Sequence, residues 1–495
     1  MDKMNEFRPQ SLYQYIAENC VEGELPIDFS LPQKTEKGKI RFADGAMDGI
    51  AMYHMGAETL DSEALNEMAA LIDLISDGKM AAADEVLADF VEKHTALSVI
   101  DPWQEYVINN RERLQANNLY HYGVDKLLTS SKINEVKYGM ILLELFILRD
   151  EKVKDAVRTV GLSDEFTLFS VFIMRKWENA NEEIFRLAKH VHGWGRIHAI
   201  ERLEASTQEI SDWLLHEGTK NLVLPTYSAL SCFEKADVPG RLQKTLSHEE
   251  FVDIGNILVY MLDEGACEGI SAVGDDVLET YLEHAQSRIL DFSDYRRILA
   301  FFDYGSEKDN HTLREKCEKL LHTEECRRLV DQALQHGEGL ELASLLGVDY
   351  RKPLFDCLER QFDENYQKVS YLMREESCVD QAIELFARKL PLWQMQTGPA
   401  DEMGLGKEYD DYRKLVMIVQ ELGDKPGKGE QLLRTALQAP VINNRNMALT
   451  VLESWVEMIG RPFKEISPAL YDVLLEVKNQ EMVETVRERM EKLIG

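Results

Sequence analysis

Long apolar stretches are missing from this sequence. It contains no run of about 18 uncharged apolar residues, the length that a helix needs to cross a bilayer. Its first ten residues, MDKMNEFRPQ, also lack the apolar core of a signal peptide. We therefore expect a soluble protein that stays in the cytoplasm.

Cysteine is scarce as well. The seven cysteines are scattered, and no two of them form the C-x-x-C pair that zinc sites and thiol redox enzymes use. An odd number of scattered thiols does not suggest a disulfide framework. We expect reduced, mostly structural thiols at Cys20, Cys232, Cys267, Cys317, Cys326, Cys357 and Cys378.

Positive charge is the third deficit. The chain has 56 lysines and arginines against 88 aspartates and glutamates, which gives a net charge of −32. The short basic pairs Arg296-Arg297 and Arg327-Arg328 are flanked by carboxylates such as Asp294 and Glu324. Phosphate backbones and anionic membrane surfaces repel such a chain. We expect neither as a partner, whereas a basic protein or peptide fits the charge.

The common catalytic motifs are absent too. There is no G-x-S-x-G, no H-E-x-x-H and no G-x-G-x-x-G after a strand. The run from Asp401 to Glu408, DEMGLGKE, resembles the phosphate-binding loop of Snf2-type helicases. However, Glu408 stands where that motif has a magnesium-binding hydroxyl, and no apolar strand precedes the run. We therefore predict a flexible glycine loop and no ATP binding.

Helical periodicity is what the sequence has in abundance. With 44% hydrophobic residues, 29% charged residues and only 13 prolines, the composition is that of a folded chain. Residues 135–149 are apolar on almost every face, as in a helix packed between neighbours. Val153, Ala156, Val157 and Val160 then recur at helical spacing. Short polar breaks separate such segments, which predicts an all-α fold of antiparallel helix pairs.

Two segments far apart share the pattern R-x-x-A-[IL]-x-x-L, namely residues 196–203 and residues 445–452. The small alanine allows the two helices of a pair to approach closely. The pattern resembles the second helix of a HEAT repeat. This resemblance implies an α-solenoid of degenerate HEAT/armadillo-like helix pairs, whose core grows with each added repeat.

The predicted organisation has four parts. Residues 1–60 form an irregular cap in which residues 39–43 and 49–53, joined at Asp44-Gly45, pair as a β-hairpin. Residues 61–396 form the solenoid. Residues 397–429, rich in glycine, form a loop or hinge region. Residues 430–495 form the last repeats and a polar cap.

The densest histidine group comprises His190, His192, His198 and His216. An H-x-H pair can hold one metal ion when the backbone is extended, but residues i and i+2 point apart on a helix, and the local pattern is helical. A zinc site would also need a placed carboxylate or thiolate, and none can be identified. We therefore predict no metal site and interpret these four residues as histidines buried between helices. If a metal site did exist, they would be its candidate ligands.

The run from Phe42 to Gly56, together with residues 192–198 (HGWGRIH), resembles a group of Firmicutes chains that carry the label limonene hydroxylase. The resemblance implies a monooxygenase. Activating oxygen needs haem, flavin or non-haem iron. The sequence contains no cysteine ligand loop, dinucleotide fingerprint or facial triad for these groups. No catalytic residue is therefore assigned, and no cofactor is expected.

These observations favour a protein–protein interaction scaffold without catalysis of its own, because solenoids present an extended surface to their partners. The alternative is an enzyme or cofactor-binding protein with a site assembled across repeats. Its residues would come from the histidine group at 190–216 and from the segment between Asp44 and His54.

Overall fold

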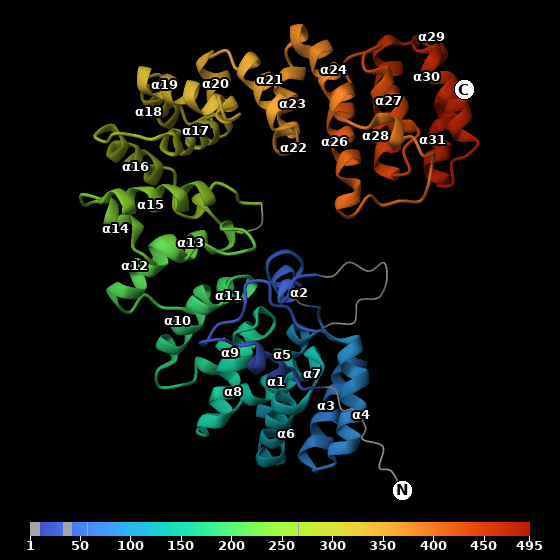
Figure 1. The fold of residues 1–495 in the computed structure, drawn as a ribbon. Coiled ribbons are helices and arrows are strands. Elements are labelled where there is room, and N and C mark those ends of the chain that lie inside the picture. Colours follow the sequence, from blue (N-terminus) through green and yellow to red (C-terminus); the bar gives the residue numbers. More distant parts are fainter. Residues whose placement is uncertain (1–9, 33–41, 57, 266) are drawn as a thin grey trace. The chain divides into compact units, whose positions relative to one another are not determined.

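The computed structural model describes residues 10–32, 42–56, 58–265 and 267–495, and throughout this part the chain is built from helices (Figure 1). The β-type pairings among these residues are two isolated bridges, one between Val21 and Glu24 and one between Glu402 and Val441. The predicted all-α class is confirmed for the described chain. No helix within it is both long and apolar enough to cross a membrane.

The chain divides into two compact units. The first contains residues 1–289 and 300–316, and the second contains residues 290–299 and 317–495. The division runs through α17 (Phe292–Glu307) and α18 (His311–Leu321). Residues 397–429 lie inside the second unit and include α26 (Asp410–Gln420).

The first unit consists of short helices joined by short connections. They are α1 (Leu12–Asn19), α2 (Ala46–Ile50), the π-helical turn η1 (Ala51–Met55), α3 (Ser62–Ser76), α4 (Met80–Lys93), α5 (Ala96–Asn109), α6 (Ala116–Thr129), α7 (Ile133–Glu144), α8 (Glu151–Gly161), α9 (Asp164–Met174), α10 (Ala180–His190), α11 (Trp194–Arg202), α12 (Gln208–Glu217), α13 (Thr226–Lys235), α14 (Val238–Leu242), α15 (His248–Tyr260), η2 (Ile270–Ala272) and α16 (Asp276–Gln286).

The second unit has the same character. Beyond α18 its elements are α19 (Glu324–Leu334), α20 (Leu340–Leu346), α21 (Arg351–Arg360), α22 (Phe362–Asn365), η3 (Tyr366–Lys368), α23 (Val369–Met373), η4 (Glu376–Cys378), α24 (Val379–Lys389), α25 (Leu392–Met395), η5 (Lys407–Tyr409), α26, α27 (Glu430–Leu437), α28 (Ile442–Ile459), α29 (Phe463–Ile466), α30 (Pro468–Lys478) and α31 (Glu484–Ile494).

Alternate helices of the first unit pack side by side. Helix α7 contacts α9, α9 contacts α11, α11 contacts α13, and α13 contacts α15, while α8, α10 and α12 each pack against the helix that follows them. The sequence explains why some helices are buried on several faces and others along a single stripe. Helix α7 is buried on several faces, as its apolar pattern predicts, whereas α8 buries the stripe Val153, Ala156, Val157 and Val160.

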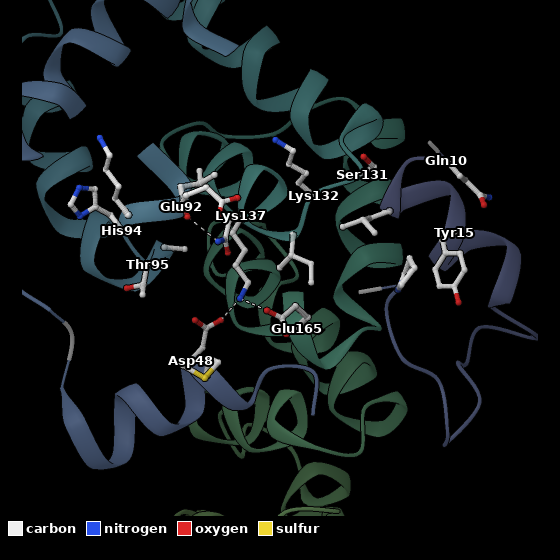
Figure 2. Close-up of a pocket in the computed structure, with 18 residues that line it drawn as sticks. Gln10, Tyr15, Asp48, Glu92, His94, Thr95, Ser131, Lys132, Lys137 and Glu165 are labelled. Carbon is white, nitrogen blue, oxygen red and sulfur yellow. Dashed lines mark hydrogen bonds and ion pairs between the residues drawn. The ribbon is translucent and has the colours of Figure 1, made fainter. Parts of the chain in front are cut away.

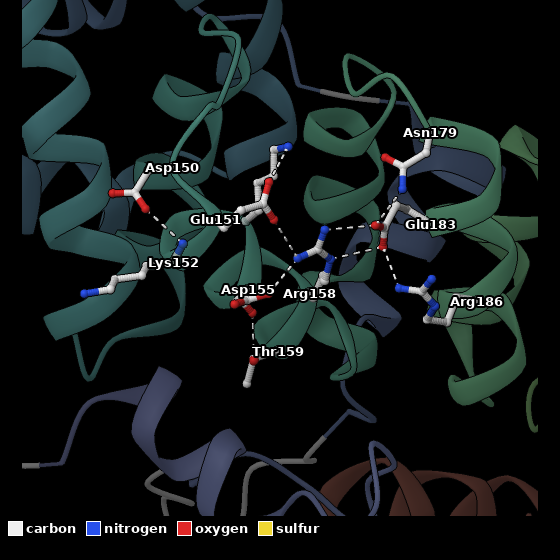
Figure 3. Close-up of polar contacts among 10 residues, drawn as sticks. Asp150, Glu151, Lys152, Asp155, Arg158, Thr159, Asn179, Glu183 and Arg186 are labelled. Atoms are coloured by element: carbon white, nitrogen blue, oxygen red, sulfur yellow. Dashed lines mark hydrogen bonds and ion pairs between the residues drawn. The ribbon is translucent and has the colours of Figure 1, made fainter.

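A polar network joins α8 to α10 (Figure 3). The guanidinium of Arg158 donates from Nε and Nη2 to the two carboxylate oxygens of Glu183, at 3.1 and 2.9 Å. Asn179 and Arg186 donate to the same carboxylate, at 3.0 and 3.2 Å. Burial alone would raise the pKa of Glu183, but the hydrogen bonds and charge of Arg158 outweigh it and lower that pKa. The carboxylate is therefore held as an anion between the helices.

Both copies of the shared arginine pattern bury their arginine. In α11, Arg196 donates from Nη2 to the carbonyl oxygen of Glu217 at 2.9 Å. In α28, Arg445 is fully buried and donates to the carbonyl oxygens of Ala439 and Pro440, each at 2.8 Å. The arginine therefore ties its helix to a neighbouring main-chain segment in each unit.

The predicted β-hairpin is wrong where it can be checked. Residues 46–55 are helical in α2 and η1, so the second arm is not a strand; residues 39–41 of the first arm lie outside the described residues. Gly45 has a φ of 76°, and it starts α2 instead of turning a hairpin. A side chain at Gly45 would also meet the main chain of Asp164, because an added Cβ would lie 2.6 Å from its carbonyl oxygen.

The glycine-rich run near residue 401 is a loop, and the element before it is α25 rather than a strand. Glu402 pairs with Val441 just before α28, and the main-chain N–H of Ile442 donates to the carbonyl oxygen of Glu402 at 3.0 Å. Gly404 and Gly406 both have positive φ angles, of 75° and 107°. The run thus packs against the start of α28 and lacks the strand that a phosphate-binding loop follows.

Candidate functional site

A cavity in the first unit has a volume of about 1300 Å³. It opens between α1, α2, the turn from α4 to α5 and the start of α7 (Figure 2). Apolar side chains form part of its wall, and the rest is polar. The lining residues used below are Asp48, Glu92, Lys93, Lys132, Lys137 and Glu165.

Lys137 holds the charged centre of this cavity. Its ammonium lies 2.6 Å from the carboxylate of Asp48 and 2.5 Å from that of Glu165, and Figure 2 shows it between the two. The side chain is only 4% exposed. Burial alone would lower the pKa of Lys137, but the two carboxylates outweigh it and raise that pKa. The lysine therefore stays charged, and it links α7 to α2 and α9.

The other two lysines of the cavity are also neutralised by carboxylates. Lys93 lies 2.7 Å from Asp89 and 3.6 Å from Glu67, and Lys132 lies 3.0 Å from Glu135. Glu92 is exposed at the cavity edge.

The three lysines line the cavity together with three carboxylates, those of Asp48, Glu92 and Glu165, and Lys93 and Lys132 are paired with carboxylates outside the lining. The described lining therefore combines apolar walls with three lysines and three carboxylates, and the exposed carboxylate of Glu92 is available to a cationic group with an apolar stem.

The segment from Asp44 to Gly56 forms one wall of this region and packs across the row of alternate helices. Asp48 reaches α7 through Lys137, and the main-chain N–H of Gly45 donates to Glu165 of α9 at 2.6 Å. Further along, the Tyr53 hydroxyl donates to Glu201 of α11. His54 Nε2 lies 2.7 Å from the hydroxyl of Tyr227 in α13.

Trp194 is the apolar anchor of this segment. It is 5% exposed, and its ring centroid lies 5.8 Å from that of Tyr53 and 4.9 Å from that of Tyr227. A Cβ added at Gly49 would lie 2.2 Å from the Trp194 ring. Only glycine therefore allows α2 to approach α11 this closely.

Asp164 holds the start of α11 in place. Its Oδ1 accepts the main-chain N–H groups of Gly193 and Gly195, at 3.1 and 2.7 Å. A Cβ at Gly193 would lie 2.8 Å from this carboxylate, so the glycine is needed for the close approach. Burial raises the pKa of Asp164 to about 6, although both N–H groups favour its charged form. This carboxylate therefore titrates above the range usual for aspartate.

The four sequence-predicted histidines do not form one site. His190 Nδ1 lies 2.8 Å from Glu24. His192 is partly buried and lines a small pocket together with His190 and residues 25–27. His198 is buried in α11, where its ring stacks on Trp194 at a centroid distance of 6.2 Å. His216 lies on α12 and pairs with Asp253 of α15 at 2.6 Å.

The two segments singled out for an enzyme do meet. Residues 44–54 pack on α11 and α13, as the contacts of Tyr53 and His54 show. Sequence reasoning missed the charged cavity beside them, because Asp48, Lys137 and Glu165 are far apart in the chain. One signal was available: Lys137 is a lone lysine inside an apolar helix, and a buried lysine needs a carboxylate partner.

No family model matches the chain, and neither a curated protein nor a solved structure matches it.

Proposed function

We propose that the chain is a protein-interaction scaffold, an α-solenoid of HEAT/armadillo-like helix pairs that binds a basic partner. The side-by-side packing of α7, α9, α11, α13 and α15 supports the solenoid, because stacked repeats place equivalent helices next to one another. The buried arginines of α11 and α28 support the HEAT resemblance. In this proposal the two units have repeats of the same kind.

The observation that carries the proposal is the cavity of about 1300 Å³ in the first unit, with the exposed carboxylate of Glu92 in its lining. It receives a lysine or arginine of the partner: the apolar stem of that side chain lies against the cavity wall, and the charged head is attracted by the exposed carboxylate of Glu92. Glu92 contributes most directly, since it is exposed at the edge. The net charge of −32 steers a basic partner toward the chain from a distance.

Fluorescence anisotropy with two labelled peptides tests the proposal, one alternating lysine and leucine and the other alternating glutamate and leucine. We expect the wild-type protein to bind the basic peptide at physiological salt and to show no binding of the acidic peptide. The variant Glu92→Lys reverses a charge at the cavity and should weaken binding by about tenfold, equivalent to roughly 1.4 kcal/mol.

The matched control is Glu85→Lys. Glu85 is exposed on the same helix as Glu92, outside the cavity, and its substitution makes the same change in net charge. Binding by Glu85→Lys should stay close to that of the wild-type protein. Equal losses in both variants would mean that the peptide responds only to overall charge, and the cavity would then not be the binding site. Failure of a pull-down at physiological salt to recover any protein partner would count against the scaffold itself.

A further inference from the structure

Three side chains capable of binding a metal meet between α12 and α15. His216 comes from α12, and Glu249 and Asp253 come from α15, where their spacing of four residues places both on one face of the helix. One ligand atom from each side chain lies within 4.8 Å of the other two. This is the only such group of three or more among the described residues, and it contains one of the four histidines considered above.

The geometry points to a binding site for a first-row divalent cation such as Zn²⁺ at His216, Glu249 and Asp253. A neutral imidazole and two carboxylates together carry two negative charges, which balance a divalent ion. A ligand set of one nitrogen and two oxygens suits zinc and its neighbours, whereas Mg²⁺ prefers oxygen ligands alone. Water completes the coordination, since three protein ligands leave a position open.

The distances fit such an ion after a small adjustment. Bonds of about 2.1 Å in a tetrahedral site place neighbouring ligand atoms roughly 3.4 Å apart. His216 Nδ1 and Asp253 Oδ2 are now 2.6 Å apart because they share a hydrogen bond. In the metal-bound form the neutral imidazole carries its single N–H at Nε2, so the lone pair of Nδ1 binds the ion in place of the hydrogen bond to Asp253, and the pair opens by less than about 1 Å. Glu249 is exposed and can rotate toward the ion.

The surroundings hold the ligands in position and leave them open to solvent. Helices α12 and α15 pack directly against each other, so the site lies on rigid elements. The side chains of His216 and Asp253 are 25% and 18% exposed, which leaves an entry path. Asp212, one turn before His216, is not a ligand, because Arg241 donates to its carboxylate at 2.5 Å.

Isothermal titration of the full chain with Zn²⁺, in a large excess of Mg²⁺, tests this site. We expect a Zn²⁺ ion whose binding is weakened at least tenfold by His216→Ala and also by Glu249→Gln. Glu249 is exposed, so the second substitution leaves the fold undisturbed. The matched control is His248→Ala, which removes an exposed imidazole next to Glu249 but outside the cluster. It should bind Zn²⁺ as the wild-type protein does.

Two results would overturn the inference. One is a titration in which the wild-type protein takes up no Zn²⁺ in the presence of Mg²⁺. The other is Zn²⁺ binding that His216→Ala and Glu249→Gln leave unchanged, which would assign the ion to adventitious ligands such as free thiols. Neither result depends on the basic peptide, because the peptide is proposed to bind at the cavity beside Lys137.

Discussion

Two buried cations show how individual residues stabilise this chain. Lys137 in the first unit and Arg445 in the second are almost completely removed from solvent. An unpaired buried charge would be very costly, and each is therefore paired. Lys137 has two carboxylate partners. Arg445 has one, Glu481, which it contacts from Nε at 2.7 Å and from Nη2 at 3.0 Å. Lys137 and its two carboxylates together carry one net negative charge, whereas the Arg445 pair is electrically balanced.

The variant Arg445→Ala should lower the free energy of unfolding of the second unit strongly. It leaves Glu481 buried without its partner and frees three main-chain carbonyl groups. Breaking a buried ion pair costs about 3–5 kcal/mol. Urea denaturation followed by circular dichroism measures the change.

The comparison for that variant is Arg489→Ala in the same unit. The Arg489–Glu453 pair has side chains that are 29% and 41% exposed, and Arg489 also donates to Asn446 and Thr450. Water can replace these contacts, so we expect a smaller loss of stability than for Arg445→Ala. If the two variants lost similar stability, burial would not be what makes the Arg445 pair important.

At the scale of elements, the junction between α9 and α11 depends on one carboxylate. Asp164 lies at the start of α9 and accepts two N–H groups at the start of α11. Helix α2 then packs on Trp194 of the same turn. One buried side chain therefore orients the helix that carries the anchor for the N-terminal segment.

Asp164 should give this junction a distinctive pH dependence. The pKa of its carboxyl rises from the ordinary 3.8 to about 6 on folding, so the folded protein binds a proton that the unfolded chain has lost. Stability from this group is complete below about pH 4 and is lost as the pH rises through about 6. The loss is roughly 3 kcal/mol, at 1.36 kcal/mol for each pH unit.

The variant Asp164→Asn isolates this effect, because it keeps an oxygen acceptor and cannot titrate. Urea unfolding of both proteins is measured at several values between about pH 4 and pH 7. Over this range the wild-type protein should lose stability relative to the variant. Parallel curves would show that Asp164 titrates at its ordinary value in the folded protein.

The whole molecule is dominated by its negative charge of −32. Carboxylates of this number repel one another in the compact state, and they attract basic partners at a distance. Both effects are screened by salt, with a Debye length of about 8 Å at physiological ionic strength.

Added salt should therefore stabilise the free protein. Raising sodium chloride from a few millimolar to physiological strength should increase the melting temperature by about 2–4 °C, if screening contributes roughly 1 kcal/mol. Scanning calorimetry measures the shift, and choline chloride at the same ionic strength separates screening from specific sodium binding. A falling melting temperature would show that attractive ion pairs outweigh the repulsion.

The sequence alone determined the class of fold and the charge of its surface. Helix formation follows from the spacing of apolar residues three and four positions apart, so the stripe from Val153 to Val160 and the existence of the apolar helix near Met140 could be predicted. The predicted end of that helix was wrong, because it stops at Glu144 and does not reach residue 149. The same local reasoning failed at Asp44-Gly45. A glycine with positive φ suits a hairpin turn and a helix start equally, and the choice depended on Trp194 and Asp164, which lie far along the chain.

Only the tertiary structure decided which charged groups meet. Asp48 is 89 residues from Lys137, and His216 is 37 residues from Asp253. Such pairs depend on how the helices stack, and the spacing of apolar residues along the sequence does not predict that stacking. A chain with 88 carboxylates offers each lysine and histidine many possible partners. Packing selects among them, because a buried charge is tolerated only where its partner is also brought in.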